Sequence, residues 1–152
     1  MAVRNLDRLK ARLAKIPAGV RAELSKALDQ SAAEIVGMQK RLVPKKTGAL
    51  ANSIVATQGG ERVKYSQGVG GGLGDPDLSV RISAGNSAVR YAHLVEFGTK
   101  PHEVGGLFEG AQHPGSRAKP FFYPPYRALK KRSRGRITRA GAKAAKQIAA
   151  GK

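Results

Sequence analysis

The sequence has no cysteine and no tryptophan, and only 5% of its 152 residues are aromatic. Without cysteine the chain forms no disulfide framework and has no cysteine-based metal site or nucleophile. A single domain of this length has a modest core, which here must consist mainly of Leu, Ile, Val and Ala because aromatic side chains are scarce. We therefore expect association with other chains to supply part of the stability.

Acidic residues are also scarce, since ten Asp and Glu stand against 28 Lys and Arg and leave a net charge of +18. Such a charge attracts nucleic acid, an anionic membrane or an acidic protein surface. Acid–base catalysis needs carboxylates that converge, whereas these are scattered, and only Glu96 lies in an apolar segment. We expect Glu96 to pair with an Arg or Lys or to cap backbone amides, and we expect no enzymatic activity.

Long apolar runs and ligand motifs of fixed spacing are absent as well. A membrane helix needs roughly 20 predominantly apolar residues, and no run approaches that length. The N-terminus has no signal-peptide apolar region, so we expect a soluble protein that is not secreted by the usual route. The spacing of His93, His102 and His113 matches no metal-ligand pair, and the glycine run at 70–74 lacks the Gly-Lys-Ser/Thr ending of a phosphate-binding loop. We expect neither a metal nor a cofactor.

The first part of the chain shows two amphipathic patterns that predict helices. Over residues 3–16, apolar residues recur at three- and four-residue steps, with Arg and Lys on the other face. A Pro-Ala-Gly sequence interrupts this pattern, and a longer one over residues 20–42 stops before Pro44. Beyond this proline, Thr47 is expected to cap a short helix that begins near Ala49.

The middle of the chain has the β-branched and alternating composition of strands. Candidate strands at 54–57 and 62–66 flank a Gln-Gly-Gly-Glu turn, which predicts a hairpin. Residues 68–74 are too rich in glycine to pack, so we expect a mobile loop there. The clearest strand covers residues 78–84, with Leu, Val and Ile on one face and Ser and Arg on the other.

The segment RYAHLVEFGT is the one around which we expect the domain to be organised. Its large apolar side chains predict that it lies in the core. The helical spacing of Tyr91, Leu94 and Val95, followed by Gly98 and a proline, predicts a short buried helix that ends at the glycine. A strand with Tyr91, His93, Val95 and Phe97 on one face is the alternative, because periodicity does not decide so short a run.

A polar loop and a basic helix are predicted for the last third of the chain. Residues 100–119 are too many for a simple connection, so we expect a loop that is functional or ordered by a partner. An aromatic stretch at 120–126 precedes an Ala-rich helix over 127–150 that has no acidic residue. The candidate residues of this helix for contact with DNA or an acidic partner are Arg127, Lys130, Lys131, Arg132, Arg134, Arg136, Arg139 and Lys143.

The charge of this helix has two interpretations. It is either a solvated helix with surplus cations or a surface that contacts nucleic acid or an acidic protein, and we favour contact because the charge is dense and of one sign. All predicted elements together indicate one α+β domain over residues 1–152, in which a small antiparallel sheet packs against long N-terminal and C-terminal helices. The N-terminal helices take up 1–43, strands and short helices 44–99, the loop 100–119 and the basic helix 120–152.

Three segments occur in an order typical of one protein family. They are residues 43–54 (VPKKTGALANSI), 91–99 (YAHLVEFGT) and 118–126 (AKPFFYPPY). Over residues 20–135 the chain thereby resembles the small head-tail joining and tail-completion (neck) proteins of long-tailed lambdoid bacteriophages, prophages and gene transfer agents. It departs from the family pattern in the glycine-rich loop and in an insertion over 102–117, which affect its loop contacts more than its fold.

The resemblance implies a virion structural protein at the head-tail junction, which is in the host cytoplasm before assembly. It implies a homo-oligomeric ring around the DNA channel, which we expect to be hexameric, and contact with neighbouring neck and tail proteins such as the stopper, the tail terminator and the tail tube. It implies no catalytic residue and no membrane. The positive charge suits either DNA in the channel or an acidic neighbour. The alternative function is a stand-alone DNA-binding protein that uses the C-terminal helix, although no helix-turn-helix, zinc-finger or single-strand-binding arrangement is visible.

Overall fold

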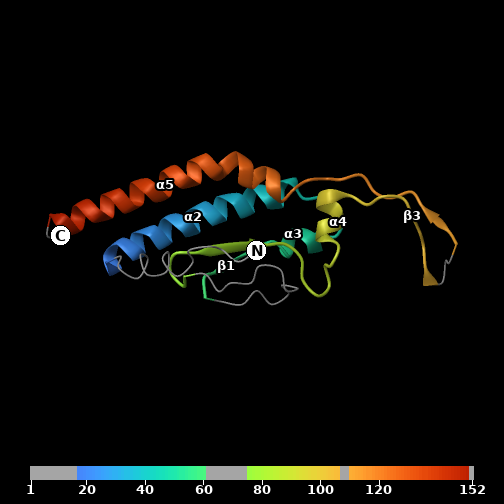
Figure 1. Ribbon diagram of the computed structural model, residues 1–152, viewed down its shortest axis with the longest axis horizontal. Coiled ribbons are helices and arrows are strands. Elements are labelled where there is room, and N and C mark those ends of the chain that lie inside the picture. Colours follow the sequence, from blue (N-terminus) through green and yellow to red (C-terminus); the bar gives the residue numbers. More distant parts are fainter. Residues whose placement is uncertain (1–16, 61–74, 107–109, 151–152) are drawn as a thin grey trace, which may run out of the picture.

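The computed structural model describes residues 17–60, 75–106 and 110–150. The helix predicted over 3–16, the strand predicted over 62–66 and the glycine-rich loop at 68–74 lie outside the described residues. Two long helices lie side by side, and a small antiparallel sheet lies against one of them (Figure 1). The predicted α+β class is confirmed. No helix in the described ranges is both long enough and apolar enough to cross a membrane.

The first long helix, α2 (Ala18–Leu42), confirms the pattern predicted over residues 20–42. It ends because Pro44 disfavours helical backbone at the residue before it, and Val43 is extended, with φ −62° and ψ 136°. Its buried residues are mostly small and follow one stripe, namely Ala27, Ser31, Ala32, Ile35 and Gln39. Small side chains along this stripe let a second helix approach closely.

The second long helix, α5 (Tyr123–Ala149), packs along α2. It begins four residues before the predicted start at Arg127, and its first turn contains Pro124 and Pro125, where the missing N–H groups cost nothing. Where the two helices face each other, Ala144 is buried, and a Cβ added at Gly141 would lie 3.3 Å from a methyl group of Leu24. The helix pair is therefore held together by close approach of small residues.

The sheet contains β1 (Val55–Gln58) and β2 (Val80–Ser83), which pair antiparallel with Val55 opposite Ser83 and Gln58 opposite Val80. Strand β1 is shifted by one residue from the strand predicted at 54–57, and β2 forms the central part of the one predicted at 78–84. The prediction that β1 pairs with residues 62–66 is not confirmed, because β2 is its partner within the described ranges. Both strands contact α2, so α2 lies between the sheet and α5 (Figure 1).

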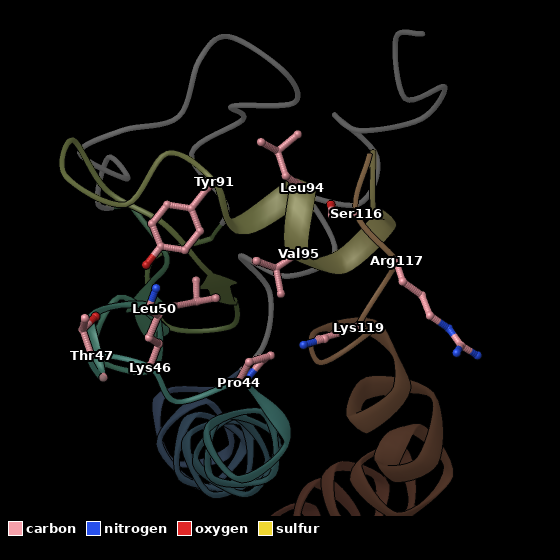
Figure 2. A pocket seen from close by; sticks show the side chains of 11 residues that line it. Pro44, Lys46, Thr47, Leu50, Tyr91, Leu94, Val95, Ser116, Arg117 and Lys119 are labelled. Carbon is pink, nitrogen blue, oxygen red and sulfur yellow. The ribbon is translucent and has the colours of Figure 1, made fainter. Parts of the chain in front are cut away.

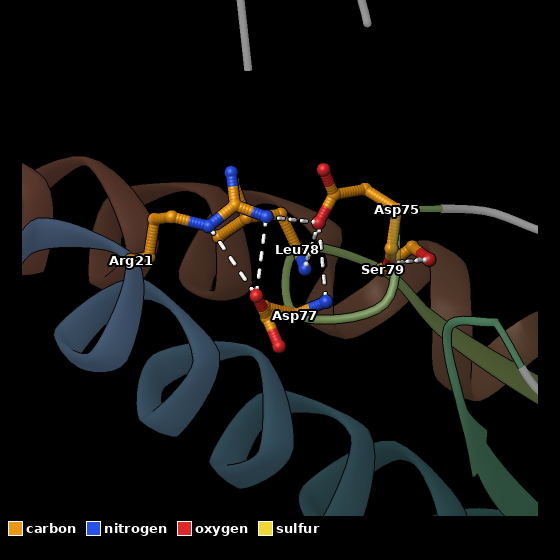
Figure 3. Close-up of polar contacts among 5 residues, drawn as sticks. All are labelled: Arg21, Asp75, Asp77, Leu78 and Ser79. Atoms are coloured by element: carbon orange, nitrogen blue, oxygen red, sulfur yellow. Dashed lines mark hydrogen bonds and ion pairs between the residues drawn. The ribbon is translucent and has the colours of Figure 1, made fainter. Parts of the chain in front are cut away.

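An ion-pair cluster joins the beginning of α2 to the turn that leads into β2 (Figure 3). The Nη2 atom of Arg21 lies 2.7 Å from Oδ1 of Asp75 and 3.2 Å from Oδ2 of Asp77. The same Asp75 oxygen accepts the backbone N–H groups of Asp77 and Leu78, at 3.1 and 3.0 Å. Burial tends to raise the pKa of the Asp75 carboxyl, but the hydrogen bonds from Arg21 and the two amides outweigh it and hold that pKa below its ordinary value. The cluster fixes the direction in which β2 begins.

The hydrophobic core lies at one end of the helix pair, where the short helices α3 (Ala49–Asn52) and α4 (Ala92–Phe97) meet the start of α5. The buried cluster brings together residues that are distant in sequence, namely Val43, Leu50, Ile54, Val89, Ala92 and Phe121. Gln39, which is 1% exposed, donates its side-chain N–H to the carbonyl oxygen of Phe122 at 2.9 Å and so ties α2 to this end of α5. Among the described residues, the mainly aliphatic composition predicted for the core is confirmed, with Phe121 as the aromatic member of the buried cluster.

The helix α4 confirms the helical interpretation of the central segment, but the prediction that its large side chains are core is wrong. Phe97 is 68% exposed, and Tyr91 and Leu94 are each 40% exposed. The residues that α4 buries are Ala92 and Glu96, and Val95 is half-buried against the core. Ala92, Val95 and Glu96 have the same three- and four-residue spacing as Tyr91, Leu94 and Val95, moved along the chain by one residue. The spacing therefore fits a helix that is turned so that this neighbouring face is buried.

Gly98 ends α4 as predicted. Its φ of +73° is rare for residues with a side chain, and its N–H donates to the carbonyl oxygen of Leu94 at 2.8 Å. A Cβ at Gly98 would also lie 2.6 Å from the carbonyl oxygen of Ser116, closer than atoms can approach. Gly98 therefore allows the chain after α4 to pair with the segment before α5.

Residues 100–119, predicted as a loop, instead contain a β-hairpin that extends away from the rest of the molecule (Figure 1). Its strands β3 (His102–Glu103) and β4 (Gln112–His113) pair antiparallel, and a further bridge joins Thr99 to Ser116 at the base. At Gly115, φ is +81° and an added Cβ would lie 2.4 Å from the carbonyl oxygen of Thr99. Two-residue strands are too short for a recognisable alternation, which is why the sequence pattern indicated only a loop.

Candidate functional site

A groove of about 350 Å³ opens between three segments that are distant in sequence (Figure 2). The turn at 44–50 forms one wall, the exposed face of α4 forms the second, and residues 116–119 form the third. Each wall includes residues from one of the three segments on which the family resemblance depends. We call this the motif groove.

The floor of the motif groove is apolar and its rim is basic. Leu50, Tyr91 and Leu94 supply apolar surface, and the cations that line the groove are Lys46, Arg117 and Lys119. Figure 2 shows Lys119 extending towards Pro44 and Arg117 pointing outward. No acidic residue of the described ranges lines it. The groove therefore suits an apolar side chain that is accompanied by a carboxylate.

Backbone hydrogen bonds hold the walls in place. The N–H of Lys119 donates to the carbonyl oxygen of Val95 at 2.8 Å, which fixes the third wall against α4. In the first wall, the N-cap of α3 is Gly48, in the left-handed region at φ +78°, and not Thr47 as predicted. The Thr47 hydroxyl accepts the Ala49 N–H at 3.4 Å, so it supports the turn without occupying the cap position.

Glu96 lies behind the groove and fixes the start of α5. Its carboxylate is buried, with Oε2 accepting the N–H groups of Phe121 and Phe122 at 2.7 and 2.8 Å and Oε1 accepting that of Tyr123 at 3.1 Å. These amides belong to the N-terminal end of α5, where the first N–H groups have no partner within the helix and where a negative charge is favoured. The prediction that Glu96 caps backbone amides is confirmed.

The predicted contact residues of α5 divide into two groups. Glu34 of α2 binds Arg136 at 2.6 Å and Arg132 at 3.1 Å, and Arg136 also donates to the Ser31 hydroxyl at 2.9 Å. These two arginines hold α5 against α2. The other cations of the helix are exposed and form no ion pair within the described ranges; they are Arg127, Lys130, Lys131, Arg134, Arg139, Lys143 and Lys146.

The Glu34 ion pair predicts a pH dependence of stability. The hydrogen bond from Arg136 lowers the pKa of Glu34 against the opposing effect of burial, and the charge of Arg132 adds to the lowering. Because the pKa is lower in the folded state, the pair stabilises the protein above the ordinary carboxyl value of 4.5, and this stabilisation is lost as the pH falls through the folded pKa.

We expect Glu34→Gln to lower the melting temperature at neutral pH and to have a smaller effect near pH 3, below the ordinary carboxyl value. Arg136→Gln should show the same pattern, because it removes the other partner. Thermal unfolding followed by circular dichroism at both pH values measures this. A Glu34→Gln destabilisation of equal size at both pH values would show that the charge of Glu34 is not the cause.

The structure brings together two histidines that the sequence did not connect. His102 and His113 face each other across the hairpin, with ring centroids 5.0 Å apart, and the Nδ1 atom of His113 accepts the N–H of Gly115 at 3.0 Å. His93 is exposed and lies on α4 rather than on the hairpin. Within the described ranges no group of three or more His, Cys, Asp or Glu residues is placed to hold a metal ion.

These observations define a small α+β protein with two candidate binding surfaces, the motif groove and the exposed cations of α5. The model of the family described as "Bacteriophage HK97-gp10, putative tail-component" matches residues 7–98, which is more than half of the chain. The chain belongs to this family of phage tail components, and the resemblance based on its three segments is confirmed at that level. No curated protein and no solved structure gives a significant match. The hairpin and α5 lie beyond the matched residues.

Proposed function

We propose that this protein is a structural component of the neck of a long-tailed phage, prophage or gene transfer agent, where it forms a ring around the DNA channel. Its family membership supports a role in the tail. In this role the subunit contacts copies of itself and neighbouring proteins such as the stopper, the tail terminator and the tail tube. It acts in the virion at the head-tail junction, through binding surfaces rather than catalysis.

The exposed charge of α5 is the observation that best supports this role. Helix α5 contains no acidic residue, and within the described ranges only its Arg132 and Arg136 form ion pairs with α2. The remaining cations repel one another, so they are a cost to the isolated domain and suit a surface that meets negative charge. In a neck that surface is either DNA in the channel or an acidic neighbour.

Stand-alone DNA binding is the second candidate function, and the same helix supports it. A free DNA-binding element would neutralise phosphates in proportion to the cations that reach the duplex. The exposed cations spread over the broad side of α5 that faces away from α2 rather than along one narrow stripe, which suits a junction between several surfaces better than one groove of DNA. We therefore favour the neck.

A triple variant with Lys131→Ala, Arg134→Ala and Lys143→Ala distinguishes the two functions. All three residues are exposed and none contacts Glu34, so the helix pair is left intact. For a stand-alone DNA-binding protein, the plot of log affinity against log salt should flatten by about three units, at about 0.9 for each lost phosphate contact. For a neck protein, the variant should yield filled heads that fail to join tails.

A matched control removes three exposed cations elsewhere, through Lys26→Ala, Arg41→Ala and Arg90→Ala, and so has the same net charge. We expect it to assemble normally and to keep the original salt dependence to within about one unit. Normal particles from the α5 variant, together with lost binding to duplex DNA in vitro, would show that the neck assignment is wrong and the DNA-binding one right.

A further inference from the structure

The β3–β4 hairpin is the one described part of the chain that extends from the body without packing against it (Figure 1). All four residues of its two strands are exposed. An isolated two-stranded hairpin is marginally stable in water, and its outer edges carry unpaired backbone groups that can pair with another chain. Exposed strands that do not pack on their own chain suit pairing with a partner.

The charge of the hairpin differs from that of the rest of the protein. Residues 101–116 include no Lys or Arg and two of the ten acidic residues of the chain. Glu103 is exposed and, within the described ranges, has no hydrogen bond or ion pair through its carboxylate, whereas Glu34, Asp75 and Glu96 are all engaged. Two copies of a chain of charge +18 repel each other, and this repulsion is weaker where the approaching segment has no cations.

The motif groove has the complementary chemistry. Its apolar floor includes the exposed sides of Tyr91 and Leu94, and its rim includes Arg117 and Lys119. On the hairpin, the apolar Val104 directly follows Glu103, so one short stretch offers both an apolar side chain and a carboxylate. The hairpin does not fill the groove of its own chain, because the bridge between Thr99 and Ser116 directs its strands away from the body (Figure 1).

We propose that the β3–β4 hairpin of one subunit docks into the motif groove of the next copy. Val104 then covers the apolar floor beside Leu94, and Glu103 faces the cations Arg117 and Lys119. The hairpin and the groove are different surfaces, so the contact is head-to-tail. Repeated contacts of this kind form a closed ring when the rotation from one subunit to the next brings the last subunit back to the first. The inference rests on the proposed ring and specifies which surfaces form it.

Charge exchange tests the contact in the full-length protein. We expect Glu103→Arg and Arg117→Glu, each alone, to weaken self-association by roughly tenfold or more, as measured by sedimentation equilibrium at low salt. Mixing the two variants should restore it, because each supplies the surface that the other lacks. A mixture that associates no better than the separate variants would overturn the proposed pairing.

Cross-linking gives a second measurement, which is clean because the chain has no cysteine of its own. Leu94→Cys and Val104→Cys variants, mixed under mild oxidation, should yield a disulfide-linked dimer, whereas Val104→Cys mixed with the exposed control Ala142→Cys should not. Rings without this cross-link would refute the hairpin contact and leave the ring standing. Cross-linked dimers that never close into rings would support the contact and refute the ring. Absence of both rings and cross-link at the highest soluble concentration would refute the hairpin contact.

Discussion

Phe121→Ala is expected to destabilise the protein by about 3 to 5 kcal/mol, whereas Phe97→Ala should cost less than about 1 kcal/mol. Phe121 is 1% exposed and lies in the core with Leu50 and Ile54, so its removal leaves a cavity as well as losing burial. Phe97 is mostly exposed, and its ring meets that of Tyr123 with centroids 6.0 Å apart, a contact worth only a small amount.

The two variants make the same substitution at positions whose largest difference is burial. Urea unfolding measures both, and the dependence of stability on urea should be similar in the two so that midpoints can be compared. The larger effect is enough to unfold a domain of ordinary stability. If Phe97→Ala proved as costly as Phe121→Ala, the exposed face of α4 would have to be covered in solution by another part of the chain or by another copy.

The contrast between these residues shows what the sequence determined and what it did not. Helices α2, α4 and α5 were predicted because their spacing, and the Gly or Pro that ends or begins them, are local features. Which face of α4 is buried depends on Glu96, whose partners at the start of α5 are 25 to 27 residues away. A spacing of three and four residues fits two adjacent faces equally well, so only tertiary contacts decide between them.

The candidate site was predictable in composition but not in arrangement. The cations of α5 were identified from the sequence, and so were the three segments that form most of the motif groove. It did not indicate that Arg132 and Arg136 are bound by Glu34, because these partners are 98 and 102 residues apart. The hairpin was missed because two-residue strands carry no periodic signal, although its lack of Lys and Arg was visible in the sequence.

Removal of the Glu96 carboxylate is expected to have the second large effect. Glu96→Ala leaves the N–H groups of Phe121, Phe122 and Tyr123 without an acceptor at the edge of the core. An unpaired buried donor costs about 1 to 3 kcal/mol, and water can reach the partly buried ones, so we expect a total of about 2 to 4 kcal/mol. Glu96→Gln retains one acceptor oxygen and should cost about half as much.

Hydrogen exchange separates this capping role from a general loss of packing. If Glu96 acts as a cap, Glu96→Gln should speed amide exchange at Phe121, Phe122 and Tyr123 well before it affects the middle of α5, because fraying begins at the helix end whose donors were capped. Glu103→Ala, which removes an exposed carboxylate, should change the stability of the monomer by no more than about 0.5 kcal/mol. Unchanged exchange at the three amides in Glu96→Gln, with a normal melting temperature, would show that α5 begins without help from this carboxylate.

Local fraying would also loosen the wall of the motif groove that ends at Lys119, so the same variant should weaken docking into the groove even where the domain stays folded.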